Sequence, residues 1–167
     1  MTEEEKYLVR TRDLPPDAGK DVRLAVNPKA EVRLVPLAER TGLKRTAVNL
    51  GRVPPGKESF IYHCHAVTEE WLFILSGAGT AEIGDARVPV GPGDFMGFPP
   101  DGTGHHLING GDEDLVYLMG SDRPPADVAR YPRLGKRLVF AGGTLTLVDD
   151  AEAETFTVEE WIGGGKK

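Results

Sequence analysis

The 167-residue chain carries 26 acidic and 20 basic side chains, so its formal net charge at pH 7 is −6. Lysine and arginine form no basic stripe, which argues against a nucleic-acid partner, and no apolar stretch is long enough to span a membrane. The acidic start (Thr2, Glu3, Glu4 and Glu5) differs from the basic opening of a signal peptide, and a single cysteine permits no internal disulfide. We therefore expect a cytoplasmic single-domain protein that can enclose a core without disulfides.

The chain opens with a charged segment, residues 1–30, which proline interrupts and which we expect to be an arm that wraps the body of the protein or is partly disordered. Short runs rich in β-branched and aromatic residues follow, separated by many of the 21 glycines and 13 prolines. The predicted strands are 32–37, 46–50, 60–65, 70–75, 79–83, 86–90, 94–98, 105–109 and 115–119. No segment has a sustained 3.6-residue period, so the pattern predicts an all-β fold with little helix.

The last third of the chain is expected to pack on this body. Residues 122–140 contain two proline-rich points and are interpreted as a surface crossing with one helical turn at most. In residues 144–162, apolar residues recur at alternate positions, at Leu145 and Leu147, and an apolar residue appears again at Phe156. This pattern predicts a terminal hairpin or a pair of edge strands. The predicted organisation is an arm (1–30), a barrel (31–121), an extension packing on the barrel (122–162) and a flexible tail (163–167).

The four histidines lie in two short clusters, and the first contains His63 and His65. In a strand these two side chains point to the same face, where two imidazoles can share one ion. Glu70 opens the next predicted strand and can face back toward the pair. Glu69 is its competitor, but parity favours Glu70, because the apolar residues two and four positions later then share its face.

The second cluster is His105 and His106. His105 shares a face with Leu107 and Asn109 and is predicted to be the fourth metal ligand. His106 points to the other face, where it either contacts a metal-ligating side chain without touching the ion or faces outward. Cys64 lies between two ligands and should face away from them as a small buried side chain. Imidazoles with a carboxylate suit iron, manganese, nickel, copper or zinc better than magnesium or calcium.

Two stretches of the chain resemble the two conserved motifs of the cupin family. They are Gly56 followed by His63-x-His65-x4-Glu70-x6-Gly77, and Gly93-x5-Pro99 followed by Gly102, His105 and Asn109. The spacing departs from the family pattern by one extra residue before His63 and one in the loop after Pro99, both outside the ligand spacings. The resemblance, to small bacterial cupins, implies a jelly-roll (double-stranded β-helix) barrel. By that likeness the metal ligands are His63, His65, Glu70 and His105.

Such a ligand set leaves one or two positions on the ion open for a small molecule. Iron, manganese or copper would suit a dioxygenase-type oxidoreductase, whereas zinc or nickel would act as a Lewis acid in an isomerase or lyase. We therefore expect one divalent metal ion and a small-molecule enzyme. The alternative is a cupin that binds or senses a small ligand or sugar without turnover, because the fold alone does not determine whether a reaction is catalysed.

The surroundings of the expected site are predicted less closely. Residues expected to supply apolar walls are Ile61, Leu72, Ile74, Met96, Phe98, Leu107 and Met119. Polar side chains that could orient a ligand are Tyr62, Asn49, Arg52 and Tyr117. Apolar chain ends favour a homodimer that pairs through edge strands and exchanged arms.

Overall fold

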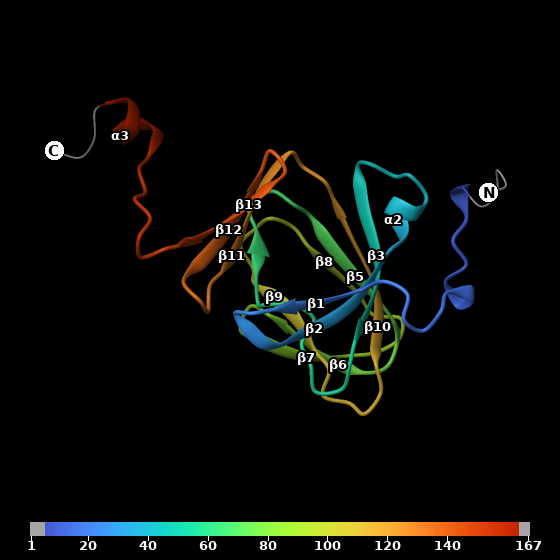
Figure 1. Ribbon diagram of the computed structural model, residues 1–167. Coiled ribbons are helices and arrows are strands. Elements are labelled where there is room, and N and C mark those ends of the chain that lie inside the picture. The colour runs from blue at the N-terminus through green and yellow to red at the C-terminus, as the bar shows by residue number, and fades with distance from the viewer. Residues whose placement is uncertain (1–5, 164–167) are drawn as a thin grey trace.

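The computed structural model describes residues 6–163, which form three antiparallel sheets with little helix (Figure 1). The six-stranded sheet has the order β1 (Lys20–Leu24), β2 (Asn27–Pro36), β3 (Thr46–Val53), β10 (Leu115–Asp122), β5 (Glu70–Ser76) and β8 (Phe95–Phe98). The four-stranded sheet has the order β13 (Thr144–Asp149), β12 (Lys136–Ala141), β11 (Ala126–Tyr131) and β4 (Cys64–His65). The third sheet has the order β7 (Ala86–Val90), β6 (Gly79–Ile83) and β9 (His105–Ile108). The expected all-β class is confirmed.

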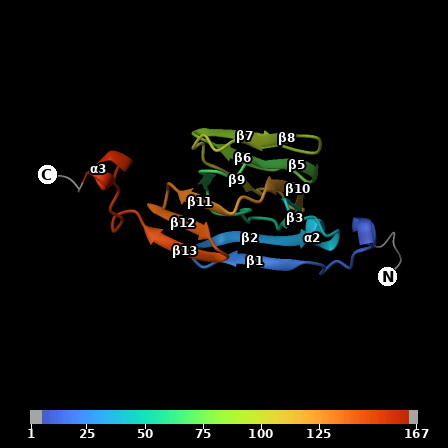
Figure 2. The same cartoon turned by 90° about the horizontal axis from the view of Figure 1, so that it is seen from above.

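The six-stranded sheet curves, so that β1 and β2 lie opposite β5 and β8 (Figure 2). Its central strand, β10, pairs with β3 on one side and β5 on the other. Inward-pointing side chains of this sheet and of the three-stranded sheet form one buried cluster. Its members are Val32, Val53, Leu72, Ile74, Ala81, Val90, Met96, Phe98, Leu107, Leu115 and Tyr117.

One glycine makes room for the largest fully buried side chain of this cluster. Tyr117 faces Gly51 across the β3–β10 pair, and a Cβ atom at Gly51 would lie 2.7 Å from Cζ of the tyrosine ring. The absence of a side chain at this position therefore allows the ring to lie flat against the neighbouring strand.

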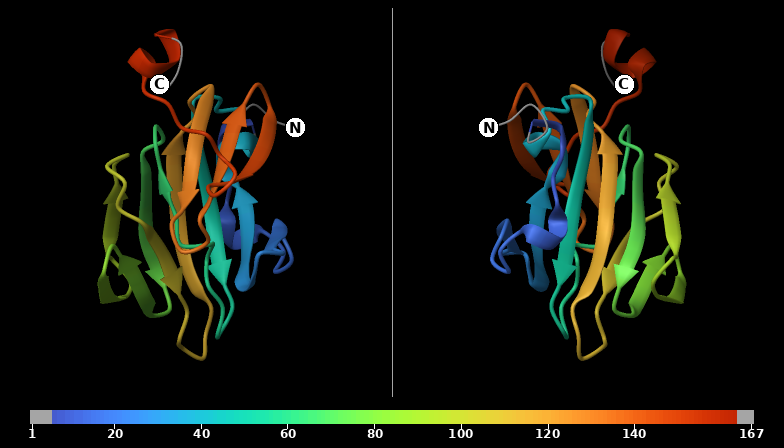
Figure 3. Two further views of the ribbon diagram at one scale, coloured as in Figure 1. Left: turned by 90° about the vertical axis from the view of Figure 1, so that its left-hand side faces the viewer. Right: turned by 90° about the vertical axis from the view of Figure 1, so that its right-hand side faces the viewer.

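The helical segments are short. They are a 3₁₀ turn (Thr11–Asp13), α2 (Leu37–Arg40) and α3 (Val158–Ile162). Within residues 6–163, no helix has the length and apolar character that a membrane crossing needs. A capping box between Thr157 and Glu160 begins α3, which stands away from the barrel at the end of the chain (Figures 1 and 3).

Three sequence-based expectations are corrected. The predicted strand 60–65 is reduced to the two residues of β4, because the preceding residues form isolated bridges and loop hydrogen bonds. The predicted surface crossing 122–140 contains the hairpin of β11 and β12, since its prolines precede β11 or lie in the turn and leave the strands uninterrupted. The end of the chain, expected to be strands as far as residue 162, forms β13 and then α3.

The predicted arm, residues 1–30, contributes β1 and the first part of β2 to the six-stranded sheet. Its first five residues lie outside the described part of the chain, as does the predicted tail after Gly163. The hairpin of β12 and β13 continues the sheet from β11 and lies beside the open end of the barrel (Figure 3).

Candidate metal centre

Three of the four predicted ligands lie in β4, β5 and β9, and His63 directly precedes β4. His63 and His105 exchange backbone hydrogen bonds of 3.2 and 2.7 Å as an antiparallel bridge, so their imidazole rings lie side by side with centroids 4.7 Å apart. His65 lies in β4, and Glu70 is the first residue of β5. Residues that are 42 positions apart in sequence, from 63 to 105, are thereby brought to one place inside the barrel.

Three imidazole nitrogens converge on one carboxylate oxygen. The Nε2 atoms of His105, His63 and His65 lie 3.1, 3.4 and 3.5 Å from Oε2 of Glu70. Two ligands that each lie about 2.1 Å from one ion are about 3.0 to 3.4 Å apart at ordinary coordination angles. Among the described residues, His63, Glu70 and His105 form the compact group, with donor atoms within 4.8 Å of one another, and His65 is not part of it. His63, Glu70 and His105 could therefore hold a metal ion.

The opposite nitrogen of each imidazole also faces an oxygen acceptor. Nδ1 of His63 and Nδ1 of His105 lie 2.7 and 3.5 Å from the carbonyl oxygen two residues earlier, and Nδ1 of His65 lies 2.5 Å from Oδ2 of Asp127. Each ring thus has an oxygen acceptor at both Nδ1 and Nε2. An imidazole can donate from both nitrogens only when it is protonated and cationic, and three cationic rings beside two carboxylates are costly in a buried site. A metal ion removes this conflict, because a neutral imidazole donates through Nδ1 and coordinates through Nε2.

The charges of the site reflect this clustering. The Glu70 side chain is 14% exposed, and burial alone would raise its pKa, but hydrogen bonds with the three imidazoles hold that pKa well below its usual range. Burial and the nearby charge of His63 lower the pKa of His105, although Glu70 opposes the shift. For His65, burial is outweighed by the two carboxylates, and the pKa is raised.

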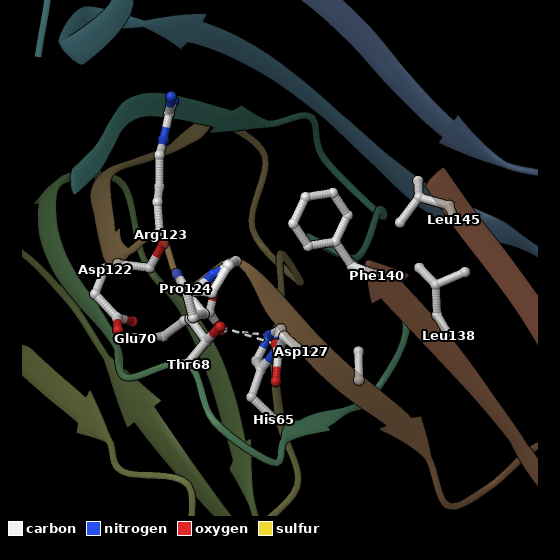
Figure 4. A pocket seen from close by; sticks show the side chains of 13 residues that line it. His65, Thr68, Glu70, Asp122, Arg123, Pro124, Asp127, Leu138, Phe140 and Leu145 are labelled. Carbon is white, nitrogen blue, oxygen red and sulfur yellow. Dashed lines mark hydrogen bonds and ion pairs between the residues drawn. The ribbon is translucent and has the colours of Figure 1, made fainter. Parts of the chain in front are cut away.

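Asp127 in β11 accepts a hydrogen bond from Nδ1 of His65, on the side of the ring opposite Glu70. The sequence analysis missed this residue. Its carboxylate accepts hydrogen bonds from His65, from Oγ1 of Thr68 at 2.8 Å and from the backbone N–H of Val67 at 3.0 Å (Figure 4). Although burial opposes ionisation, these bonds lower the pKa of Asp127. The alternation of Asp127, Ala129 and Tyr131 was the available signal, but it has meaning only once 126–131 is identified as a strand.

The remaining predicted residues fall in different places. Cys64 is buried, and burial raises the pKa of its thiol, as expected for an inert side chain. His106 is buried as well, so the outward alternative is wrong: its Nε2 lies 2.9 Å from Oε2 of Glu82. Among the expected wall residues, Ile61 and Met119 line the cavity beside the donor set, and Phe98 stacks on His105 with ring centroids 3.6 Å apart.

The expected orienting residues do not line this cavity. Tyr62 donates its hydroxyl hydrogen bond to the carbonyl of Gly84, and Arg52 lines a groove elsewhere on the surface. Tyr117 is fully buried in the core, which raises the pKa of its hydroxyl group. Asn49 is absent from the residues that line either hollow at the site.

Two neighbouring hollows adjoin the donor set. An inner cavity of about 230 Å³ lies against His63, His65 and Glu70, and an outer pocket of about 570 Å³ extends from His65 and Glu70 toward β12 and β13 (Figure 4). They share His65, Glu70, Ala129 and Leu138. Apart from the donor residues and Tyr131, the inner cavity is lined by apolar side chains, which would keep part of the bulk water away from a small molecule at the donor set.

An antiparallel barrel with a buried histidine and carboxylate cluster defines a class of metal-binding β-barrel proteins. The family model described as "Cupin domain" matches residues 49–120, the part of the chain that holds all four predicted ligands. A curated relative, Protein SchB from Streptomyces halstedii, is 30% identical over 132 residues, covering 77% of this chain and 87% of that protein. The chain belongs to the cupin superfamily, and the expected jelly-roll fold is confirmed.

Two solved structures show how far the likeness extends. A putative sugar phosphate isomerase from Acidithiobacillus ferrooxidans is 33% identical, with a TM-score of 0.86 over 93% of this chain and 99% of that one. A cupin sugar phosphate isomerase from Silicibacter pomeroyi is 23% identical, with a TM-score of 0.74 over 88% of this chain and 98% of that one. The second likeness, at this low identity, establishes the fold alone.

Proposed function

We propose that this protein is a mononuclear metal-dependent enzyme in which His63, His65, Glu70 and His105 bind one divalent ion. The observation that carries the proposal is the convergence of three Nε2 atoms on Oε2 of Glu70 beside a largely apolar cavity. Iron, manganese, nickel, zinc and copper suit these donors. When bound, the ion would supply Lewis acidity or, if redox-active, reactivity toward dioxygen.

The residues of the chain have distinct roles in this proposal. The carbonyl oxygen of Ile61 and the carboxylate of Asp127 orient His63 and His65, so that their Nε2 lone pairs face the ion. Phe60 and Met119 exclude water from the space beside it. The name of the relative that is 33% identical supports an isomerase type of reaction. A dioxygenase type of reaction is the second candidate.

Metal analysis of protein purified without added metal or chelator tests the proposal. We expect close to one ion per chain in the wild type and a large loss in His63→Ala and Glu70→Gln. Glu69→Gln is the matched control, because Glu69 is the exposed neighbour of Glu70 and lies outside the donor set. Substoichiometric metal that His63→Ala leaves unchanged would exclude the ligand assignment.

We also propose that the protein is a cytoplasmic homodimer. The support for pairing is the exposed apolar surface of α3, where Val158, Trp161 and Ile162 are 70, 73 and 78% exposed. Light scattering at micromolar concentration should give about twice the 18.1 kDa of one chain, and Trp161→Glu should lower that mass. A mass of one chain for the wild type would contradict pairing.

A further inference from the structure

The inner cavity contains one polar side chain besides the donor set. Its other walls within residues 6–163 are Leu24, Phe60, Ile61, Met119, Ala129 and Leu138, and Tyr131 completes the lining. Tyr131 is the last residue of β11, on the same strand face as Asp127, and its ring centroid lies 6.5 Å from that of His63. The phenol group is therefore held next to the space where a molecule at the ion would lie.

The hydroxyl group of Tyr131 has no hydrogen-bond partner within residues 6–163. The hydroxyl group of Tyr62, in contrast, donates to the carbonyl oxygen of Gly84 at 2.9 Å. A half-buried hydroxyl group normally finds a partner, and in a cavity with apolar walls that partner must be water or a ligand. Tyr131 can therefore donate to an oxygen atom of a molecule that fills the cavity.

The outer pocket offers little to a phosphate group. Arg123 is the one lysine or arginine that lines either hollow in the described chain, and its Nη2 donates to Glu39 at 3.1 Å. Figure 4 shows the Arg123 side chain directed away from His65 and Glu70. A phosphate group needs charge-assisted donors, and the carboxylates of Asp122 and Asp127 that line the same pocket would repel it.

The walls of the outer pocket suit an apolar body instead. Leu138 and Phe140 of β12 and Leu145 of β13 form one side, with Pro124 opposite them (Figure 4). Sugar hydroxyl groups would find no partners on this side of the pocket, whereas a flat apolar ring system would bury its surface against it. The two neighbouring hollows thus offer a polar region at His65, Glu70 and Tyr131 and an apolar region along β12 and β13.

Building on the proposed metal site, we propose that the ligand is a phosphate-free, largely apolar molecule with two adjacent oxygen atoms, such as an aromatic diol or an enolised diketone. Its oxygens lie at the ion, Tyr131 donates a hydrogen bond to one of them, and its ring system extends along Phe140 and Leu145. This substrate class differs from the sugar phosphate in the name of the relative that is 33% identical.

Binding measurements with defined probes on the metal-loaded protein test this assignment. The probes are 2,3-dihydroxynaphthalene, naphthalene and fructose 6-phosphate, titrated by calorimetry, with metal content measured before and after. We expect the diol to bind more tightly than naphthalene and fructose 6-phosphate to bind weakly or not at all. Tighter binding of fructose 6-phosphate than of the diol would overturn the proposed substrate class.

Two conservative variants test the role of the hydroxyl group. Tyr131→Phe keeps the ring and should weaken diol binding about three- to tenfold, the loss expected for one hydrogen bond, with naphthalene binding and metal content unchanged. Tyr62→Phe removes a hydroxyl group outside the cavity and should leave diol binding unchanged. Equal diol affinity in wild type and Tyr131→Phe would refute the assignment of Tyr131. Absence of bound metal would instead refute the proposed function, so the two failures are distinguishable.

Discussion

Replacing Asp127 by asparagine tests whether the metal site depends on a residue that does not touch the ion. In the native protein one carboxylate oxygen accepts from both His65 and Thr68, and the other accepts from the N–H of Val67. An asparagine amide has one acceptor oxygen and one donor nitrogen. In either orientation its NH₂ group faces at least one donor, so the hydrogen bonds that hold His65 cannot all be kept.

The expected magnitude follows from this loss. Outer partners of metal-bound histidines typically change metal affinity about 10- to 100-fold, and we expect Asp127→Asn to weaken binding within that range. The assay is competition with a chelator of known affinity, with the thermal unfolding midpoint of the metal-free protein measured in parallel. Asp122→Asn is the matched control, because Asp122 lines the same pocket and, within residues 6–163, its carboxylate accepts only from the N–H of Glu69. Wild-type metal affinity in Asp127→Asn would refute the proposed role of Asp127.

Two further predictions concern stability. In the metal-free protein the lowered pKa of Glu70 gives stability that is present above pH ~4.3 and lost as the pH falls. The raised pKa of His65 gives stability that is present below pH ~6.5 and lost as the pH rises, whereas the lowered pKa of His105 makes its protonation below pH ~6.5 costly in the folded state. Because the two histidines oppose each other, the loss through Glu70 should dominate in acid, and urea unfolding should show stability falling from pH ~6 to pH ~4. Unchanged stability over that range would contradict this. Gly51→Ala should lower the free energy of unfolding by about 1 to 3 kcal/mol through its clash with Tyr117, whereas Gly91→Ala, which has open space, should change it little.

The sequence contained enough information for the barrel and for the set of candidate ligands. Strand parity alone chooses Glu70 over Glu69 and His105 over His106, and in the structure the chosen side chains are the ones that meet. Parity works here because one face of each strand is buried, so a register error would expose the whole apolar set.

The groups around the ligands could not be predicted in the same way. Asp127 contacts a histidine 62 positions earlier in the chain, and only the pairing of β11 with β4 brings the two together. Prolines on both sides of β11 made this segment resemble a surface crossing, although prolines are tolerated at strand ends. Tyr131 was missed for the same reason, so a single wrong assignment of secondary structure removed both residues from the predicted site.

The position of β11 near the end of the sequence has a consequence for how the site is made during synthesis. His63, His65, Glu70 and His105 all leave the ribosome before Asp127 and Tyr131, and a nascent chain that ends before β11 has the donors without the strand that orients His65. Because metal binding free energy adds to folding free energy only when the donors are held in place, tight metal uptake should await the hairpin of β11 and β12. The protein would thus complete its barrel first and acquire its ion afterwards.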